Sequence, residues 1–373
     1  MKKYYKVAGL TFTISGQDEG YYNALTDYFS DKEVNEAQES PLIEIVVSIE
    51  NNDVDFQPDF YSLAGSVSFN HTTYRIKKRH FTYTVSNLFD KNKPTRVVLH
   101  PTVSWLYTKA LIAGTEVDYH NKYRVFASAV TNYSGMWYLF AITLMKVNQA
   151  FIHCGMMSNK EDGTGIILTG TGGCGKTSIM MELITSGGYQ YMSEDFGIVG
   201  KDGKLFDMQK KAAIYQSDVK WGNPYLRKAI KKLPLSQRIE WDVKKNLNRN
   251  PLHYFKPVEL FGDNISHQSQ LRKVFYLKRA QPGRKIECNK MPADHIAERA
   301  KTASFRELKE LYEILSNIRA VGGVEYYNDY PSVFELENQY TEIMYNAFKD
   351  VECYELLVPL RVNPKDTVKF IID

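Results

Sequence analysis

The sequence predicts an α/β fold with a β-rich N-terminal region. Through residue 130, short runs of β-branched and aromatic residues are separated by Asn, Asp and Lys turns, which is typical of a meander of strands. From Ala150 onward, strand-like runs alternate with helical patterns. That alternation indicates an α/β core with a layered sheet.

In the N-terminal region we expect strands and one short helix, at 21–29. The expected strands are 42–49, 67–69, 74–76, 83–85 and 97–100. The stretch 134–148 is apolar on nearly all sides and predicts a buried helix.

The expected core alternates strands with one helix: strands 151–157 and 165–169, helix 176–185 and strand 189–192. A late strand is expected at 274–277. Apolar residues on one face predict a helix at 304–318. A helix at 333–348 and a closing strand at 354–362 complete the chain.

Composition excludes several classes of protein. The chain has 373 residues, a net charge of +4 and 13% aromatic residues, so extensive disorder and collagen-like or coiled-coil structure are excluded. Its four cysteines show neither CxxC nor zinc spacing, which favours a reducing compartment. The longest apolar run, 136–145, falls short of the ~20 residues of a membrane span. We therefore expect a cytoplasmic protein with no membrane partner.

A phosphate-binding motif follows the expected strand 165–169 and opens the expected helix. It matches G-x-x-x-x-G-K-[ST], and its residues are Gly170, Thr171, Gly172, Gly173, Cys174, Gly175, Lys176 and Thr177, with Ser178 next in the helix. Glycines let backbone N–H groups surround phosphate oxygens, and the helix N-terminus adds positive charge. Lys176 is expected to bind the β- and γ-phosphates, and Thr177 a Mg²⁺ ion.

Two adjacent carboxylates, Glu194 and Asp195, end the expected strand 189–192 and its continuation. Strand ends face the ligand crevice in open α/β sheets, and adjacent side chains on a strand point to opposite faces. One carboxylate can therefore serve as a base and the other can bind Mg²⁺ beside Thr177, a role we assign to Asp195. The alternative is an exposed acidic turn.

Two further residues have an open interpretation. His153 lies in the strand that leads into the core, where it is either catalytic or a structural histidine. Cys174 lies within the phosphate loop, where a helix N-terminus favours the thiolate and hence redox sensitivity. The alternative for Cys174 is a small residue that fills a variable loop position.

The stretch 150–207 resembles the HPr kinase/phosphorylase family in four ordered parts. His153 opens a strand, as in the family's His-Gly strand, and the phosphate loop follows a hairpin. The next helix ends in Gly187-Gly188-Tyr189, like the family's basic-Gly-His/Tyr. Ser193-Glu194-Asp195 then stands where the family has Ala/Ser-Asp-Asp.

The resemblance implies an ATP- and Mg²⁺-dependent kinase acting on a hydroxyl, with a P-loop core related to phosphoenolpyruvate carboxykinase. It implies that Lys176 binds phosphate, that Thr177 binds metal, and that His153 lies near the transfer centre. The family's Leu-Glu-Ile-Arg-Gly signature is not found, which argues against phosphorylase activity and against HPr as substrate. The layout of the N-terminal half is similar to that of the stand-alone HPr-kinase-related proteins, some of which phosphorylate a peptide serine.

A basic segment, 210–250, follows the core and carries eleven Lys and Arg against three acids. It is interpreted as a solvated face, as a clamp on ATP phosphates or an acidic substrate, or as a nucleic-acid surface. The clamp candidates are Arg227, Arg238 and Arg249. No nucleic-acid-binding signature accompanies the segment, so no nucleic-acid partner is expected.

The sequence therefore favours a kinase that phosphorylates a Ser or Thr hydroxyl of a peptide or protein, or a small-molecule alcohol. The alternatives are an ATP-binding switch or scaffold without transfer, and a carboxykinase-like enzyme acting on a small carboxylic acid. We expect three parts: a β-rich domain 1–130, a P-loop kinase core 131–280 containing the basic segment, and a C-terminal α/β extension 281–373. A homo-oligomer is also considered, because HPr kinases form rings.

Overall fold

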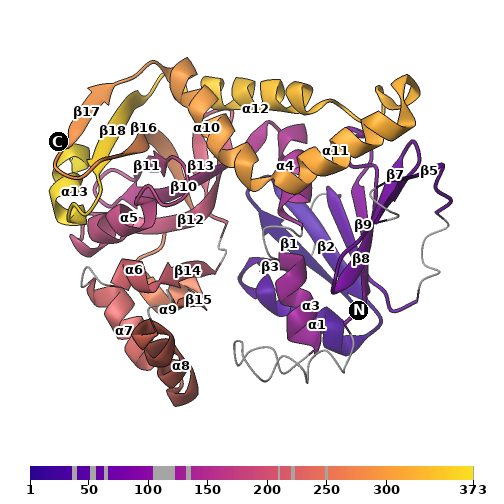
Figure 1. Ribbon diagram of the computed structural model, residues 1–373, viewed down its shortest axis with the longest axis horizontal. Coiled ribbons are helices and arrows are strands. Elements are labelled where there is room, and N and C mark those ends of the chain that lie inside the picture. Colours follow the sequence, from indigo (N-terminus) through magenta and orange to yellow (C-terminus); the bar gives the residue numbers. More distant parts are fainter. Residues whose placement is uncertain are drawn as a thin grey trace. The chain divides into compact units, whose positions relative to one another are not determined.

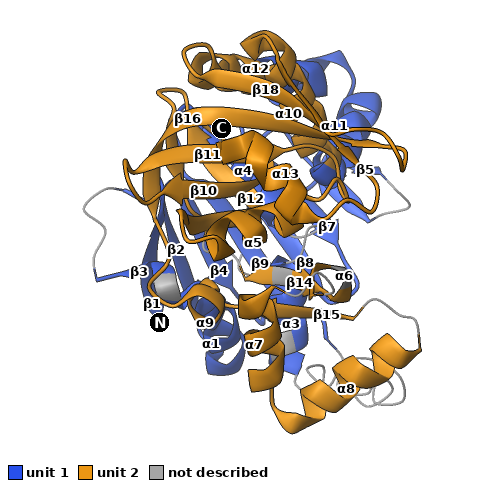
Figure 2. Cartoon of the chain, turned by 90° about the vertical axis from the view of Figure 1, so that its left-hand side faces the viewer, with its two compact units in different colours: residues 1–148, 307–339 blue, residues 149–306, 340–373 orange. Residues whose placement is uncertain are grey.

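The computed structural model describes residues 1–35, 40–50, 56–62, 66–103, 122–131, 136–208, 211–219, 223–247 and 251–372. The chain divides into two compact units, each built from two segments of the sequence (Figure 2). Unit 1 comprises Met1–Asn148 and Glu307–Gln339. Unit 2 comprises Gln149–Arg306 and Tyr340–Asp373.

A mixed sheet forms the body of unit 1 (Figure 1). Its strand order is β3-β1-β2-β4-β9-β8-β7-β6-β5. Strands β2, β4 and β9 are parallel, and the strands from β9 to β5 form an antiparallel meander. The strands are β1 (Lys2–Val7), β2 (Leu10–Gly16), β3 (Glu33–Val34), β4 (Ile43–Val47), β5 (Phe60–Ser62), β6 (Val67–Phe69), β7 (Thr73–Lys77), β8 (Phe81–Ser86) and β9 (Thr95–Pro101).

Helices pack on this sheet, and the most buried of them is α4 (Trp137–Lys146). Every α4 residue from Trp137 to Met145 is buried, because the helix is apolar on all sides. The Phe140 ring lies 5.2 Å from that of Phe12 in β2. The predicted buried helix is confirmed, although its expected first positions, 134 and 135, lie outside the described residues. The other helices of unit 1 are α1 (Glu19–Tyr28), α3 (Lys122–Thr131), α11 (Lys309–Gly322) and the start of α12 (Val333–Phe348).

Unit 2 contains a second mixed sheet, in the order β11-β10-β12-β13-β16-β18-β17. Strand β16 also pairs with β11, so five of these strands close on themselves. Strands β11, β16 and β18 are parallel, whereas β10 and β12 are antiparallel. The strands are β10 (Gln149–Asn159), β11 (Thr164–Thr169), β12 (Tyr189–Gly200), β13 (Lys204–Phe206), β16 (Gln268–Ala280), β17 (Glu287–Lys290) and β18 (Glu352–Pro359).

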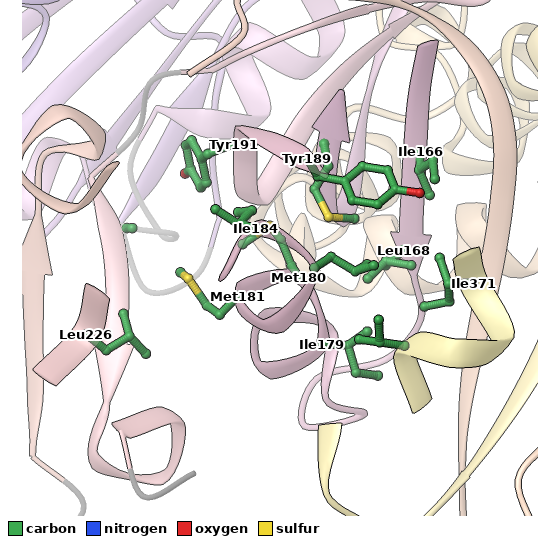
Figure 3. Packing of buried hydrophobic residues seen from close by; sticks show 14 of the residues in the cluster. Ile166, Leu168, Ile179, Met180, Met181, Ile184, Tyr189, Tyr191, Leu226 and Ile371 are labelled. Carbon is green, nitrogen blue, oxygen red and sulfur yellow. The ribbon is translucent and has the colours of Figure 1, made fainter. Parts of the chain in front are cut away.

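Helix α5 (Lys176–Thr185) packs its apolar side chains against this sheet (Figure 3). Its buried residues share one cluster with Leu168 of β11, Leu226 of α7 (Pro224–Lys232) and Ile371 of α13 (Pro364–Ile372). Neighbours on several sides explain why α5 is apolar well beyond a single stripe. The remaining elements of unit 2 are β14 (Ala212–Tyr215), α6 (Gln216–Val219), α8 (Leu235–Asn246), β15 (Leu252–Phe255), α9 (Pro257–Phe261) and α10 (Ala293–Glu307).

The α/β class and the β-rich N-terminal stretch are confirmed, and helices 176–185 and 333–348 have the expected bounds. Two expectations about elements are wrong. The strand expected at 189–192 continues to Gly200, and the helix expected at 304–318 is divided between α10 and α11 at Leu308. Leu308 has φ −95° and ψ 27°, which interrupts the helix although its apolar side chain fits the periodicity.

The division into units differs from the three parts expected at 1–130, 131–280 and 281–373. The first boundary falls at Asn148, because α4 belongs to the core of unit 1. Part of the expected C-terminal extension, Glu307–Gln339, also belongs to unit 1. No helix among the described residues is long and apolar enough to cross a membrane.

Candidate phosphate-binding site

The glycine loop connects β11 to α5, as the motif requires. Gly170 has φ +143°, and a Cβ atom there would lie 2.6 Å from the carbonyl oxygen of Leu277 in β16. Gly175 precedes α5 with φ +99°. Both positions therefore need glycine, the first for close approach and the second for its left-handed backbone.

Helix α5 begins at Lys176, and within the described chain no side chain caps its first turn. Its first N–H groups and its dipole are directed at the space enclosed by the loop, which is the arrangement that binds phosphate at helix N-termini. The exposed residues Thr171, Gly172 and Gly173 form the rim of this loop.

Lys176 places its ammonium group within the loop. Its side chain is buried, and Nζ donates hydrogen bonds to the carbonyl oxygens of Gly170 (3.0 Å) and Thr171 (3.2 Å). Because carbonyls hold the ammonium, the positive charge is fixed at the place where the phosphates of a nucleotide would lie.

Thr177 joins the loop to the acidic pair. Its Oγ1 donates a hydrogen bond to Glu194 Oε1 at 2.9 Å. Glu194 is buried and lies in β12, opposite Gly155 of β10 in the register. Thus two residues seventeen positions apart in the sequence meet beside the loop.

Asp195 occupies the next position of β12 and is more exposed than Glu194. The two carboxylates lie within β12 and not at a strand end, so that part of the expectation is wrong. The strand continues because β10 pairs with it antiparallel as far as Gly200. Asp195 has φ +67°, a left-handed conformation, so simple alternation of side chains does not hold at this point.

His153 lies in β10, opposite Phe196 in the register and one residue from the pair Cys154–Asp195. Its backbone N–H donates to Ser304 Oγ (3.0 Å), and its carbonyl accepts from Thr169 Oγ1 (2.9 Å). Its ring centroid is 6.1 Å from that of Phe196. The structure thus places buried His153 beside the strand that carries the acids, and its catalytic role stays a prediction.

Sequence reasoning did not identify Asp218 in α6 as a site residue. Its Oδ1 accepts from Ser178 Oγ at 3.2 Å, and its Oδ2 accepts from the Tyr215 N–H at 3.0 Å. Burial raises the pKa of Asp218, and the charge of Asp195 raises it further. The residue is one of three acids in the basic segment, and only this rarity could have drawn attention to it.

Arg279, near the end of β16, was also missed. Its Nε donates to the carbonyl of Gly173 (3.3 Å) and its Nη1 to that of Pro359 (3.3 Å). A Cβ atom on Gly175 would lie 2.6 Å from Nη2, so the guanidinium lies against the loop. Burial lowers the pKa of Arg279. Strands β11 and β16 are parallel, so their C-terminal ends lie at the same edge of the sheet. A cation just beyond the expected strand 274–277 was therefore the sequence signal that could have identified Arg279.

The arginines expected to clamp phosphate are not shown at the loop. Arg227 in α7 and Arg238 in α8 are exposed, and Arg238 donates to the carbonyl of Lys231. Arg249 lies outside the described residues. The cation found against the loop comes instead from β16.

Cys174 is buried, at 1% exposure, and belongs to the apolar cluster around α5. That position fits the interpretation as a filler of the loop better than the redox interpretation, because oxidants need access to the sulfur. Cys154 is also buried, and burial raises the pKa of its thiol to about 12.

The donor set fits a magnesium ion. Among the described residues, no three His, Cys, Asp or Glu side chains form a metal-binding group. Mg²⁺ in nucleotide sites needs fewer protein ligands, because it takes one or two side-chain oxygens together with phosphates and water. The Thr177 hydroxyl and the Glu194 carboxylate supply such oxygens. Asp195, the residue expected from the sequence to bind Mg²⁺, follows Glu194 directly in the chain.

A scan against protein-family models found no match to this chain, and a search of the curated proteins found no significant relative.

Proposed function

We propose that this chain is an ATP- and Mg²⁺-dependent kinase with a P-loop core of the HPr kinase and phosphoenolpyruvate carboxykinase type. It transfers the γ-phosphoryl group to a Ser or Thr hydroxyl of a peptide or protein, or to a small-molecule alcohol. The nucleotide-binding residues are those of the 170–178 stretch, with Lys176 on the β- and γ-phosphates. A cytoplasmic location and a homo-oligomer remain expectations.

The hydrogen bond between Thr177 and Glu194 carries this proposal. A glycine-rich turn without a ligand needs no acidic strand beside it, whereas a nucleotide site needs oxygen ligands for Mg²⁺ next to the loop hydroxyl. The site brings these groups together from the loop helix α5 and from β12, a different strand from the one that leads into the loop.

The geometry also supports a division of work between the acids that differs from our sequence-based assignment of the metal to Asp195. Glu194 is buried and bonded to Thr177, so it is the better ligand for Mg²⁺, which neutralises charge on the phosphates when bound. Asp195 is more exposed and is the better candidate to face an incoming hydroxyl.

In the reaction, the acceptor oxygen forms a bond to the γ-phosphorus as the bond from that phosphorus to the bridging oxygen of ADP breaks. The hydroxyl proton passes to the Asp195 carboxylate. Lys176 and Arg279 add positive charge along the phosphates, where negative charge accumulates on the leaving oxygen. His153, in the neighbouring strand, is proposed to lie near this centre.

Nucleotide binding and transfer by the purified full chain test this proposal. ATP with Mg²⁺ should raise the melting temperature, since a ligand that binds the folded state stabilises it. The γ-phosphate should label serine-containing peptides or small alcohols. Lys176→Ala should abolish both effects, whereas Lys160→Ala, an exposed lysine of the same unit, should leave them unchanged.

The experiment has three distinguishable outcomes that would contradict the proposed kinase function. Tight ATP binding without hydrolysis or transfer would favour a nucleotide-dependent switch or scaffold. Labelling only of a small carboxylic acid would favour a carboxykinase-like enzyme. The absence of nucleotide binding in the wild-type chain would refute the proposed function as a whole.

A further inference from the structure

A β-bulge interrupts strand β12 just before the acidic pair. The register with β10 shifts there: Met156 lies opposite Ser193, whereas the next residue, Met157, lies opposite Tyr191. Met192 is therefore the extra residue of the bulge. Bulges redirect the side chains that follow them and are common next to active sites.

The bulge turns Glu194 toward helix α5. Tyr191 packs in the apolar cluster around α5 (Figure 3), and Glu194 accepts the hydrogen bond of Thr177 in the same helix. Tyr191 and Glu194 are three positions apart, and in a regular strand such residues point to opposite faces of the sheet. The extra residue Met192 removes this conflict. The bulge therefore decides on which face of the sheet Glu194 lies.

The side chain of Ser193 spans the left-handed residue Asp195. Ser193 Oγ donates a hydrogen bond to the carbonyl oxygen of Phe196, three positions further along the strand. Three residues of a regular strand advance about 10 Å, so a serine side chain cannot reach that carbonyl in an extended chain. The bond forms because the backbone turns at Asp195, where φ is +67°. Ser193 therefore stabilises the left-handed conformation of Asp195.

A neighbouring segment of unit 2 anchors Ser193 in turn. Its Oγ accepts a hydrogen bond from the backbone N–H of Met208 at 3.4 Å. The residue before Met208, Asp207, is buried, and its N–H donates to the carbonyl of His267 at 3.2 Å. The Asp207 carboxylate also pairs with Nδ1 of His267 at 2.9 Å. One buried hydroxyl thus connects the acidic pair to a segment that is itself fixed at both its backbone and its side chain.

We infer that Ser193 is a positioning residue for phosphoryl transfer: it fixes the backbone that presents the Asp195 carboxylate to the acceptor hydroxyl. This inference rests on the proposed kinase function. Ser193 is buried and its hydroxyl is bonded to Phe196, so it acts through Asp195 and not on the substrate. A displacement of about 1 Å in a reacting group can cost ~10²-fold in rate, so a small relaxation of this backbone has a large effect.

The first test is the Ser193→Ala variant of the full chain, assayed with Mg²⁺-ATP and the acceptor that the wild type labels. The hydroxyl is lost and the strand is otherwise unchanged. We expect kcat to fall about 10- to 100-fold, because the carboxylate is displaced. The KM for ATP should stay within about twofold of the wild-type value, because the loop and Lys176 keep their contacts.

Ser158→Ala is the matched control. Ser158 is a buried serine of β10, and its Oγ also donates to a carbonyl oxygen, that of Gly163, at 3.2 Å. Each alanine variant loses one buried hydroxyl, so the two melting temperatures should fall by similar amounts. Only Ser193→Ala should lower kcat. Equal kcat values in the two variants would overturn the inference.

A double-mutant cycle tests whether Ser193 acts through Asp195. In the Asp195→Asn chain the base is absent, so a further Ser193→Ala exchange should lower kcat by less than about threefold. The same 10- to 100-fold loss in both backgrounds would show that Ser193 supports the site in another way, and would also overturn the inference.

Backbone amide hydrogen exchange tests the positioning without any activity. In Ser193→Ala, the amides of residues 193–197 should exchange about tenfold faster than in the wild type, whereas Ser158→Ala should leave them unchanged. Unchanged exchange in Ser193→Ala would overturn the inference whatever the activity. Faster exchange in a chain whose wild type neither binds nucleotide nor transfers phosphate would refute the kinase function, and with it the catalytic role of the Asp195 backbone that Ser193 holds.

Discussion

Asp195 combines a partly exposed carboxylate with a left-handed backbone inside a paired strand. For a non-glycine residue that conformation costs about 1 kcal/mol or more, and Asp and Asn tolerate it best. Such local strain is concentrated at functional sites. The backbone at Asp195 therefore favours a functional side chain at this position over a structural one.

Asp195→Asn separates chemistry from folding. Asn has the same shape and accepts a left-handed backbone, so the melting temperature should stay close to that of the wild type. It cannot accept the hydroxyl proton, and phosphoryl transfer should fall by about 10²–10⁴-fold, the usual contribution of a general base. ATP binding, measured by thermal shift, should persist. Full transfer by this variant would contradict the assigned role.

Replacement of Arg279 should weaken nucleotide binding more strongly when the nucleotide carries more phosphate groups. Its guanidinium lies against Gly173 and Gly175 and is desolvated, so the removal of a charged contact predicts about 10–100-fold weaker ATP binding in Arg279→Ala. AMP binding should change less. Arg279→Lys should recover only part of the loss, because an ammonium lacks the planar fork.

The control for this prediction is Arg272→Ala, a cation of the same strand that pairs with Asp162 at 2.8 Å. It should bind all nucleotides normally. If Arg279→Ala weakens AMP and ATP equally, the arginine only supports the shape of the loop and does not contact the β- and γ-phosphates.

At the residue scale, the predictable part of the site is the part encoded by contiguous sequence. The positions of the loop residues and of Thr177 were predictable because one contiguous motif fixes their backbone. Asp218 and Arg279 were not, because they reach Ser178 and the loop through the fold, from forty and more than a hundred residues away. A single sequence does not show which distant residues meet, so the rarity of Asp218 among cations and the place of Arg279 after a strand were the only sequence signals of these two residues.

At the element scale, periodicity predicted elements well and boundaries poorly. Helix α5 was predictable because the loop fixes its start and Gly187-Gly188 its end. Strand β12 extends past its expected end because β10 pairs with it, a tertiary effect that local sequence does not carry. The apolar period across α10 and α11 continues through their junction at Leu308, so the helix break was hidden.

The end of helix α4 shows how an element joins the sheet of unit 1 through a partly buried cation. Lys146 Nζ donates to the carbonyls of Asn87 (3.2 Å) and Asp90 (2.8 Å) and to Thr95 Oγ1 (3.2 Å). Burial lowers the pKa of Lys146 to about 8, although the charge of Asp90 opposes the shift. The charged form is therefore less favourable in the folded chain than in the unfolded one.

This pKa predicts a pH dependence of stability. Between pH 8 and the ordinary value of 10.5, the unfolded chain binds more protons at Lys146 than the folded chain does, so the free energy of unfolding should rise with pH. Lys146→Met lacks this contribution. The unfolding free energy of the wild type minus that of the variant should increase with pH. It is measured in urea from pH 7.5 to about 9.5, below the range in which tyrosines ionise. Parallel pH profiles would contradict the prediction.

For the whole molecule, chemistry and charge are concentrated in unit 2. All the site residues discussed above lie in that unit, as does the basic segment 210–250. The net charge of +4 is the sum of +8 in this segment and −4 in the rest of the chain. A near-neutral total thus conceals a strongly basic segment in the same unit as the phosphate loop, and such a segment attracts anionic ligands.

Unit 1 includes the segment Glu307–Gln339 from the C-terminal part of the chain. Hydrogen bonds of buried tyrosine hydroxyl groups connect this segment to the N-terminal part of the unit. Tyr138 of α4 donates to Tyr83 of β8 at 2.9 Å, and Tyr83 donates to Glu310 of α11 at 3.0 Å. Tyr83 and Tyr138 are fully buried. Without α11, the Tyr83 hydroxyl would lose its acceptor, at a cost of about 1–3 kcal/mol for one unsatisfied buried group.

This arrangement predicts that residues 1–148 do not fold stably alone. Besides Glu310, the segment Glu307–Gln339 supplies Asn317, which accepts from Ser62 Oγ at 2.9 Å, and Tyr326, whose ring lies 5.4 Å from that of Phe69. Its absence leaves a buried apolar face of the sheet in water, so the fragment should bind a hydrophobic dye and aggregate. A chain in which a flexible linker joins residues 307–339 to the fragment should recover cooperative unfolding, whereas the same chain with Glu310→Ala and Tyr326→Ala should recover it incompletely. Cooperative unfolding of 1–148 by itself would show that the N-terminal sheet needs no partner from the end of the chain, and that the boundary of unit 1 lies at Asn148 alone.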